Sequence, residues 1–448
     1  RSLVGSEMCI RDRPGRRAHA PASHRKTSIP MKNFLCPLIA LFLTACTPSD
    51  TWLRHTECLI TGTIPGDAPE EVLLSLPGTR FEYSTKIPVR EGRFEYLLRT
   101  DTLRIYELLV PTGTGSFLYT RFIPEPEGVR IECTGSDPDN RQLRLLAQGP
   151  INREWTETLR EKEQRFGARF DSIIDIEDRL YRENRLYNDT YNEVIRRLNE
   201  PTDQHALPYL YKQLNHMRLT GSGYTDEGQR LHQTLQTLYE EQAVWLQEQI
   251  ARRPSLASFC RLMEQIDQEQ MAGRDFSRWL AIYDRAFADR YPAHPYHEQV
   301  EHARKSLKTG IGGRYIDFTL PDTEGRPTTL SAVIDGKIAL LDLWASWCRP
   351  CRLRSRNTIP IYEKYRSRGF VVVGVAREFK NDKAWRTALE HDAYPWLNLL
   401  EMDDSTKLWE QYGLGSAAGQ TYLIDRDGTI LAINPMADEL ERLLREKL

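Results

Sequence analysis

A short apolar segment at residues 340–344, Leu-Leu-Asp-Leu-Trp, leads directly into a pair of cysteines near the C-terminal end of this 448-residue chain. The segment has the composition of a buried strand, and the residues after Cys348 read as a helix that carries Cys351, Leu353 and Ile359. Two thiols separated by two residues, where a buried strand ends and a helix begins, can form a reversible disulfide whose outer sulfur is a good nucleophile. The junction therefore predicts a redox-active thiol pair.

The residues around the pair favour the same chemistry. Unpaired N–H groups and the positive end of the helix dipole stabilise the thiolate of Cys348, while Cys351, one turn inside, is expected to be the more buried, resolving thiol. Pro350 suits the first helical turn because it lacks only an N–H that has no helical partner. Arg349 adds a cation that stabilises the thiolate and makes the couple more oxidising. Trp347 is expected on the exposed rim, where its flat face can bind an incoming disulfide-bearing loop.

Several segments of the C-terminal region carry a family pattern. They are the entry Gly-Arg-Tyr-Ile-Asp-Phe-Thr-Leu at 313–320 with Asp322 and Gly325, the run 343–348, the strand 370–375 and the hairpin 422–430. With these segments, residues 311–448 resemble the thioredoxin superfamily, and more narrowly the envelope-anchored thioredoxin-like proteins of the TlpA and ResA kind. The resemblance implies an α/β thioredoxin-like fold and a thiol-disulfide oxidoreductase that uses a redox-active disulfide and no other cofactor. Its implied partners are disulfide-bearing envelope proteins, which it reduces, and a membrane electron-donor protein.

Asp342 is an unexpected residue for a doubly covered strand, because burying a carboxylate costs free energy unless it is partnered or useful. It matches the acid that thioredoxins carry six residues before the first cysteine, beneath the pair. The resemblance therefore implies that Asp342 is the general acid/base for Cys351. The alternative is a strand-end aspartate that reaches water or a backbone N–H.

Two positions depart from the family pattern. Arg354 stands where ResA-like proteins place a glutamate, three residues after the second cysteine. Gly419 occupies the slot of the cis-proline that thioredoxins hold opposite the cysteines. A glycine can expose its backbone to an extended substrate for strand-like pairing, so Gly419 is a candidate substrate-binding residue, although it lacks the rigidity of proline.

Three other functions remain alternatives. Peroxiredoxins share the implied fold, but their reactive cysteine follows Thr or Ser at minus three and Pro at minus seven, where this chain has Ala345 and Leu341. A zinc site needs two more ligands at recognisable spacing, and Cys260 and the scattered histidines offer no such pair, so no metal site is predicted. A lipid-tethered binding or scaffold protein with a vestigial thioredoxin module would explain Gly419 and Arg354, but the intact run 347–351 argues against it.

The N-terminal region predicts where the chemistry takes place. Met-Lys-Asn at 31–33 is followed by an apolar run at 34–43 and by Leu-Thr-Ala-Cys ending at Cys46, which resembles a bacterial lipoprotein signal peptide over 31–45. The run is too short to span a bilayer of about 30 Å. We expect a lipid anchor on Cys46, a tether at 46–57, and a protein held on a membrane of the cell envelope, facing the periplasm. The alternative is an ordinary cleaved signal peptide with an incidental cysteine.

Residues 1–30 do not fit a signal peptide, and part of this stretch resembles translated sequencing adapter. We expect them to be a non-native leader. A net charge of −2, without a basic patch interleaved with aromatics, argues against nucleic acid as a partner. Of the eight cysteines, Cys9, Cys36 and Cys46 fall in the leader, signal peptide and anchor, which leaves five in the folded chain.

Residues 58–150 predict a small antiparallel β-sandwich, which resembles an N-terminal domain of unknown function that precedes thioredoxin domains in many envelope lipoproteins. The predicted strands are 58–64, 71–76, 94–98, 103–110, 117–123 and 129–133. Cys58 and Cys133 fall in the first and last of these strands, either bridged or as two unpaired buried thiols.

Residues 151–305 predict amphipathic helices with breaks at Pro201, 221–223 and Pro254, and a buried Cys260. This segment is either a spacer that holds the redox domain away from the membrane or a surface for homodimer formation or substrate docking. The chain is thus predicted to be multidomain, with an N-terminal sandwich, a central helical segment and a C-terminal thioredoxin-like domain at 311–448.

Overall fold

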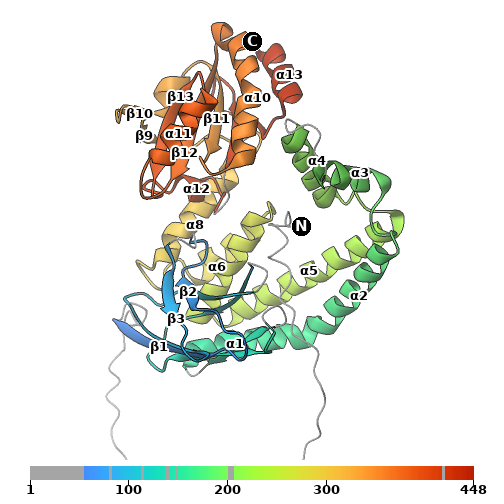
Figure 1. Cartoon of the computed structure of the whole chain (residues 1–448), viewed down its shortest axis with the longest axis vertical. Helices are drawn as coiled ribbons and strands as arrows, with labels where there is room; N and C mark the ends of the chain where they lie inside the picture. Colours follow the sequence, from blue (N-terminus) through green and yellow to red (C-terminus); the bar gives the residue numbers. More distant parts are fainter. Residues whose placement is uncertain are drawn as a thin grey trace, which may run out of the picture. The chain divides into compact units, whose positions relative to one another are not determined.

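The structure is a computed structural model that describes residues 55–79, 83–112, 116–137, 141–147, 149–199, 206–415 and 419–448. It forms two compact units, whose main boundary lies between Asn152 and Arg153, while Gly78 and Thr79 are grouped with the second unit. Figure 1 labels the helices and strands of the chain. The predicted leader, signal peptide, Cys46 and most of the tether lie outside the described residues. Within the described ranges, no helix is both long and apolar enough to cross a membrane.

The first unit is built from two four-stranded sheets with strand orders β4-β1-β7-β8 and β3-β2-β5-β6. Its described strands are β1 (Thr56–Thr63), β2 (Glu71–Ser75), β3 (Thr85–Pro88), β4 (Arg93–Thr100), β5 (Tyr106–Pro111), β6 (Phe117–Phe122), β7 (Val129–Thr134) and β8 (Gln142–Ala147). Side chains alternate between buried and more exposed along β1, as expected for a strand with one covered face. Both sheets contribute buried side chains to one hydrophobic cluster, which includes Ile60, Leu108 and Phe122.

The predicted strand-rich character of this region is confirmed, with differences in detail. The sequence did not reveal β3, which is short and buries only Ile87, or β8. The expectation of a purely antiparallel arrangement is wrong at one place, because β1 and β7 pair in parallel with Ile60 opposite Val129. A parallel pair needs a long crossover connection, and the short turns of this region gave no sign of one.

Cys58 and Cys133 are buried and not bonded to each other. In the parallel β1–β7 register, the position on β1 opposite Cys133 is six residues beyond Cys58. The two cysteines are therefore separated by about 20 Å along the strands. Burial raises the pKa of both thiols. The bridged alternative is therefore wrong, and both cysteines are core residues.

The predicted helices follow the strands. They are α1 (Pro150–Lys162), a π-helical turn (Glu163–Gly167), α2 (Ala168–Arg182), α3 (Asp189–Asn199), α4 (Leu207–Thr220), α5 (Asp226–Arg252), α6 (Leu256–Met271), α7 (Ser277–Ala286) and α8 (Pro295–Ser306). Those after α1 lie wholly in the second unit. Gly221 ends α4 with a φ of 73°, and Ser255 caps α6 by accepting a hydrogen bond from the N–H of Ser258. The predicted breaks at 221–223 and Pro254 are confirmed, whereas Pro201 lies outside the described residues. Cys260 is wholly buried within α6.

The C-terminal part is a five-stranded sheet with the order β13-β12-β11-β14-β15 and a separate β9–β10 hairpin. Its elements are β9 (Thr319–Pro321), β10 (Pro327–Thr329), α9 (Leu330–Ile334), β11 (Ile338–Trp344), α10 (Arg349–Tyr365), β12 (Phe370–Glu378), α11 (Lys383–Asp392), β13 (Leu397–Met402), α12 (Leu408–Gln411), β14 (Gln420–Ile424), β15 (Ile430–Ile433) and α13 (Ala437–Lys447). Strands β11, β12 and β13 are parallel, and β14 and β15 complete the sheet in antiparallel pairings.

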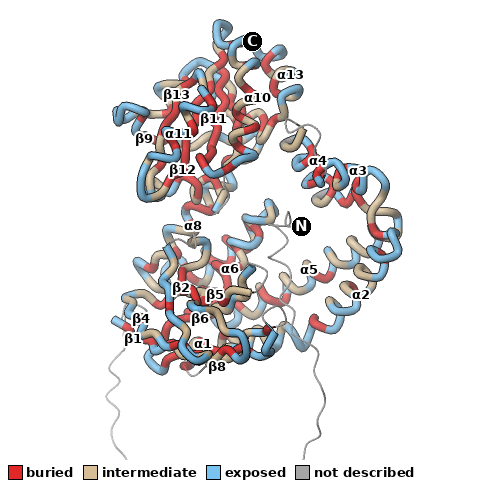
Figure 2. Tube along the Cα trace, in the orientation of Figure 1, coloured by how far each residue is buried: buried red, intermediate tan, exposed pale blue. Residues whose placement is uncertain are grey.

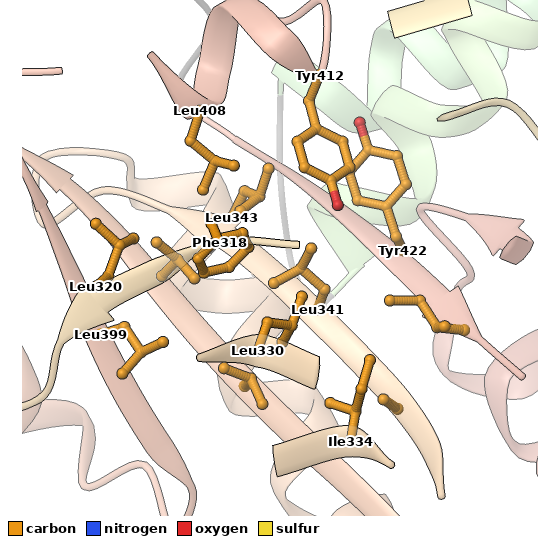
Figure 3. Packing of buried hydrophobic residues seen from close by; sticks show 14 of the residues in the cluster. Phe318, Leu320, Leu330, Ile334, Leu341, Leu343, Leu399, Leu408, Tyr412 and Tyr422 are labelled. Atoms are coloured by element: carbon orange, nitrogen blue, oxygen red, sulfur yellow. The ribbon is translucent and has the colours of Figure 1, made fainter. Parts of the chain in front are cut away.

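Strand β11 is central in this sheet and buried along its whole length (Figure 2). Its side chains alternate between two cores. Ile338 and Leu340 pack with α10 and α13, which lie side by side in Figure 1. Leu341 and Leu343 face the opposite core, where Phe318, among others, packs beside them (Figure 3). This burial on both faces explains the continuous apolar segment in the sequence.

Candidate active site

The two cysteines lie where β11 ends and α10 begins, as predicted. A turn connects the two elements, and in it the N–H of Cys348 donates to the carbonyl of Ala345 at 3.0 Å. Cys348 is the N-cap of α10, and its Sγ accepts the N–H of Cys351 at 3.2 Å. Pro350 lies in the first turn of the helix. The outer sulfur is therefore at the positive end of the helix dipole.

Cys348 and Cys351 form a disulfide, with their Cα atoms 5.3 Å apart. Cys348 is 6% exposed and Cys351 is 4% exposed, so the expected difference in burial between the outer and inner sulfur is small. Trp347, immediately before the nucleophile, is 44% exposed. The bonded pair thus lies just below the surface beside an accessible aromatic ring.

Asp342 lies on β11 and is buried, with 2% exposure. Its carboxylate accepts hydrogen bonds from the Ser355 hydroxyl at 2.5 Å and from the Arg354 guanidinium at 3.3 Å. The same Ser355 oxygen lies 3.0 Å from the carbonyl oxygen of Cys351. The carboxylate therefore does not reach water at the strand end, and Ser355 connects it to the main chain of the inner cysteine.

Arg354 faces the buried acid instead of solvent. Its guanidinium contacts Asp342 and also donates to the side-chain oxygen of Asn434 at 3.3 Å. The sequence showed only that a glutamate is replaced by a cation here. The structure adds that this cation compensates the charge of Asp342.

Two further buried carboxylates lie around the same turn, and the sequence reading did not single out either. Asp392, at the end of α11, accepts hydrogen bonds from Arg352 at 2.6 and 3.0 Å and from the Tyr394 hydroxyl at 2.9 Å. Burial opposes its ionisation, but hydrogen bonds from Arg352, His391 and Tyr394 outweigh burial and lower the pKa of Asp392 to about 2. The second carboxylate, Glu378, accepts hydrogen bonds from Ser346.

Gly419 directly precedes β14, whose first residue Gln420 pairs with Leu343 of β11. A Cβ atom at position 419 would lie 1.9 Å from the carbonyl oxygen of Leu343 and 2.9 Å from the Cα of Trp344. Only glycine fits this close approach between backbones. The preceding residues 416–418 lie outside the described ranges, and the substrate-binding role of Gly419 stays a prediction.

Within the described parts of the chain, no group of three or more His, Cys, Asp or Glu side chains is placed to hold a metal ion.

Comparison with family models finds a match in the C-terminal part of the chain. Residues 311–433 match the model of the AhpC/TSA family. The thiol:disulfide interchange protein DsbE of Pseudomonas fluorescens biotype C is 32% identical over 122 residues, which cover 27% of this chain and 64% of that protein. A thiol-disulfide oxidoreductase ResA of Bacillus cereus is 26% identical over 125 residues, covering 28% of this chain and 69% of that protein.

Among solved structures, the thioredoxin domain of a thiol-disulfide oxidoreductase from Bacteroides vulgatus has 25% identity and a TM-score of 0.28, covering 31% of this chain and 96% of that one. This chain spans just under two thirds of the DsbE protein. The strand order, the family match and the named relatives together identify the C-terminal region as a thioredoxin-like domain with thiol-disulfide oxidoreductase homologues.

Proposed function

We propose that this chain is a thiol-disulfide oxidoreductase that exchanges disulfides with other proteins through Cys348 and Cys351 and acts as a reductant. The observation that carries the proposal is the disulfide between these residues at the N-terminus of α10, next to the exposed Trp347. A helix N-terminus stabilises a thiolate, and an exposed indole offers an apolar face to a partner. The relatives named as interchange proteins and oxidoreductases support the same activity.

In the reducing direction, the thiolate of Cys348 attacks one sulfur of a partner disulfide. A bond forms between Cys348 and that sulfur while the partner's own S–S bond breaks, and the second partner sulfur leaves as a thiolate that takes up a proton. Cys351 then loses its proton and attacks the sulfur of Cys348, which closes the Cys348–Cys351 disulfide and releases the first partner sulfur. Two electrons have moved to the partner, and a membrane electron-donor protein then reduces the pair again.

The neighbouring residues have defined roles in this scheme. Asp342 takes the proton from Cys351, and Ser355 connects the carboxylate to that part of the helix. Arg349 stabilises the Cys348 thiolate, and Pro350 fixes the first turn of the helix. Gly419 offers its backbone to an extended partner segment.

The location of the protein belongs to the same proposal. The lipobox ending at Cys46 supports a lipid anchor, and hence a place in the cell envelope, on the periplasmic side, with disulfide-bearing envelope proteins as substrates. The shared core of the two N-terminal sheets supports a β-sandwich, which has no assigned chemistry. The helical segment serves as a spacer or as a dimer or docking surface.

The activity is tested by insulin reduction with dithiothreitol as the electron source. The wild-type chain should accelerate insulin precipitation, and Cys348→Ser should abolish the acceleration because it removes the attacking sulfur. No acceleration by the wild-type chain would contradict the proposal and favour a binding or scaffold protein with an inactive module. Consumption of hydrogen peroxide at a rate far above that of disulfide reduction would instead indicate a thiol peroxidase.

A further inference from the structure

The nucleophile is delivered by a tight turn over residues 345–348. The N–H of Cys348 closes this turn on the carbonyl of Ala345 at 3.0 Å, so Ser346 and Trp347 occupy its two central positions. Ser346 is buried, while Trp347 is exposed. The position of the Cys348 sulfur therefore depends on how firmly the peptide groups of Ser346 are held.

Glu378 binds one side of Ser346 with both of its carboxylate oxygens. The N–H of Ser346 donates to Oε1 at 2.7 Å, and the Ser346 hydroxyl donates to Oε2 at 2.8 Å. Glu378 is 3% exposed and ends β12, where its own carbonyl accepts the N–H of Asp403 at 2.9 Å. A carboxylate on a paired strand is thus a rigid support for the turn, and an ionised carboxylate can accept at both oxygens in this way.

Arg352 binds the other side of Ser346. Its guanidinium donates to the Ser346 carbonyl at 3.3 Å and is itself fixed by two hydrogen bonds to Asp392. The turn is therefore held by an anion on its N–H side and a cation on its carbonyl side. Both side chains come from elements that flank β11, so the turn is fixed relative to the sheet and to α10.

The charge of Glu378 also acts on the nucleophile. Ser346 and Cys348 are two residues apart, so their Cα atoms lie within about 7 Å of each other. The Glu378 carboxylate is hydrogen-bonded to Ser346, two residues before Cys348, and a buried negative charge there disfavours a thiolate on Cys348, since like charges repel more strongly away from water. This effect opposes the stabilisation that the helix N-terminus and Arg349 provide.

We propose that Glu378 is a positioning residue for the redox reaction, which holds the turn at 345–348 and, through its charge, keeps the Cys348–Cys351 couple more reducing than the helix N-terminus and Arg349 alone would make it. This inference rests on the proposed function, since a reductant needs a disulfide that is hard to reduce. Glu378 supplies that property from outside the Cys-X-X-Cys motif.

The test is the redox equilibrium with glutathione, in which the protein disulfide and two molecules of reduced glutathione give the protein dithiol and oxidised glutathione. Two electrons and two protons move to the protein in this reaction. Glu378→Gln keeps the size of the side chain and removes its charge, and we expect its equilibrium constant for reduction to rise about tenfold, equivalent to about 30 mV. Glu446→Gln, the same change on the exposed face of α13, should leave the constant unchanged.

Ser346→Ala supplies a second measurement with the opposite sign. It removes the hydroxyl that offsets the charge on Oε2 while the carboxylate stays, so we expect the equilibrium constant to fall about threefold. A purely structural role would move both variants in the same direction. If Glu378→Gln does not fold, Ser346→Ala alone decides, and an unchanged or higher constant overturns the inference.

Failure of this inference and failure of the proposed function give different results. If the wild-type chain reduces insulin but Glu378→Gln leaves the glutathione equilibrium within twofold of wild type, the role of Glu378 is wrong and the oxidoreductase activity stands. If the wild-type chain does not reduce insulin, the proposed function is wrong, and the inference that rests on it is wrong as well.

Discussion

Asp392→Asn tests the electrostatic account of the active-site region. The Asp392 side chain is completely buried and accepts two hydrogen bonds from Arg352. Its pKa falls from the usual 3.8 to about 2, which corresponds to about 2 kcal/mol of stability at neutral pH. Asparagine keeps the shape and loses the charge. We therefore expect the free energy of unfolding of the variant to be about 2 kcal/mol lower at pH 7. The loss is not larger because Arg352 is 26% exposed and can recover part of its hydration.

The pH dependence of this loss follows from the sign of the pKa shift. A carboxyl group whose pKa is depressed by folding contributes its stability above the unfolded-state value and loses it as the pH falls through the folded-state value. The difference between wild type and Asp392→Asn should therefore be constant from pH 7 to about pH 5. It should shrink between about pH 4 and pH 2 and vanish below that range.

The measurement must report on the C-terminal domain alone, because a multidomain chain does not unfold in one step. Hydrogen exchange of peptides from β11 and β12, followed as urea is raised, gives that local free energy. Asp382→Asn is the matched control, since it breaks an exposed pair with Arg386 on the same helix and should cost less than about 1 kcal/mol. A loss below 0.5 kcal/mol (about a quarter of the expected value) at pH 7, or a loss that persists at pH 2, would refute the reasoning.

Three further predictions concern single positions. Gly419→Ala forces a Cβ against the carbonyl oxygen of Leu343 and should destabilise the C-terminal domain by about 1–3 kcal/mol, measured by hydrogen exchange of peptides from β11 and β12 as urea is raised; unchanged local stability would contradict the close approach. Arg354→Gln leaves buried Asp342 without its cation and should cost about 1–3 kcal/mol by the same hydrogen-exchange method, whereas wild-type stability would show that the contact is not needed. Cys46→Ser should move the protein from the membrane to the soluble fraction of the envelope and abolish incorporation of labelled fatty acid; retention on the membrane would rule out this anchor.

The parts of the fold that could be predicted are those fixed by local sequence. Strand β11 is apolar along its length because both faces are covered, and the turn and helix that follow it are fixed by Cys348 and Pro350 at the start of α10. The helices of the central segment could be recognised by their apolar periodicity, and their ends by Gly221 and Ser255. In each case neighbours in sequence determine the structure.

The parts that could not be predicted depend on residues far apart in the chain. Glu378 lies 32 positions from Ser346, and Asp392 lies 40 positions from Arg352. Only the folded sheet brings these pairs to the same end of β11. The sequence shows Arg354 only as a reversal of charge, because its contact with Asp342 depends on which face of β11 the acid occupies. The parallel pairing of β1 with β7 was missed for the same reason, since register between distant strands is not encoded locally.

The most direct test of the central claim is capture of partner proteins by Cys351→Ser in the native envelope. Without the resolving sulfur, Cys348 should remain joined to the proteins it attacks, and mixed disulfides should appear on non-reducing gels and be identified by mass spectrometry. The double variant Cys348→Ser/Cys351→Ser is the control and should capture nothing. If Cys351→Ser captures no partner while its Cys348 still reacts with an alkylating reagent, the pair does not exchange disulfides with envelope proteins.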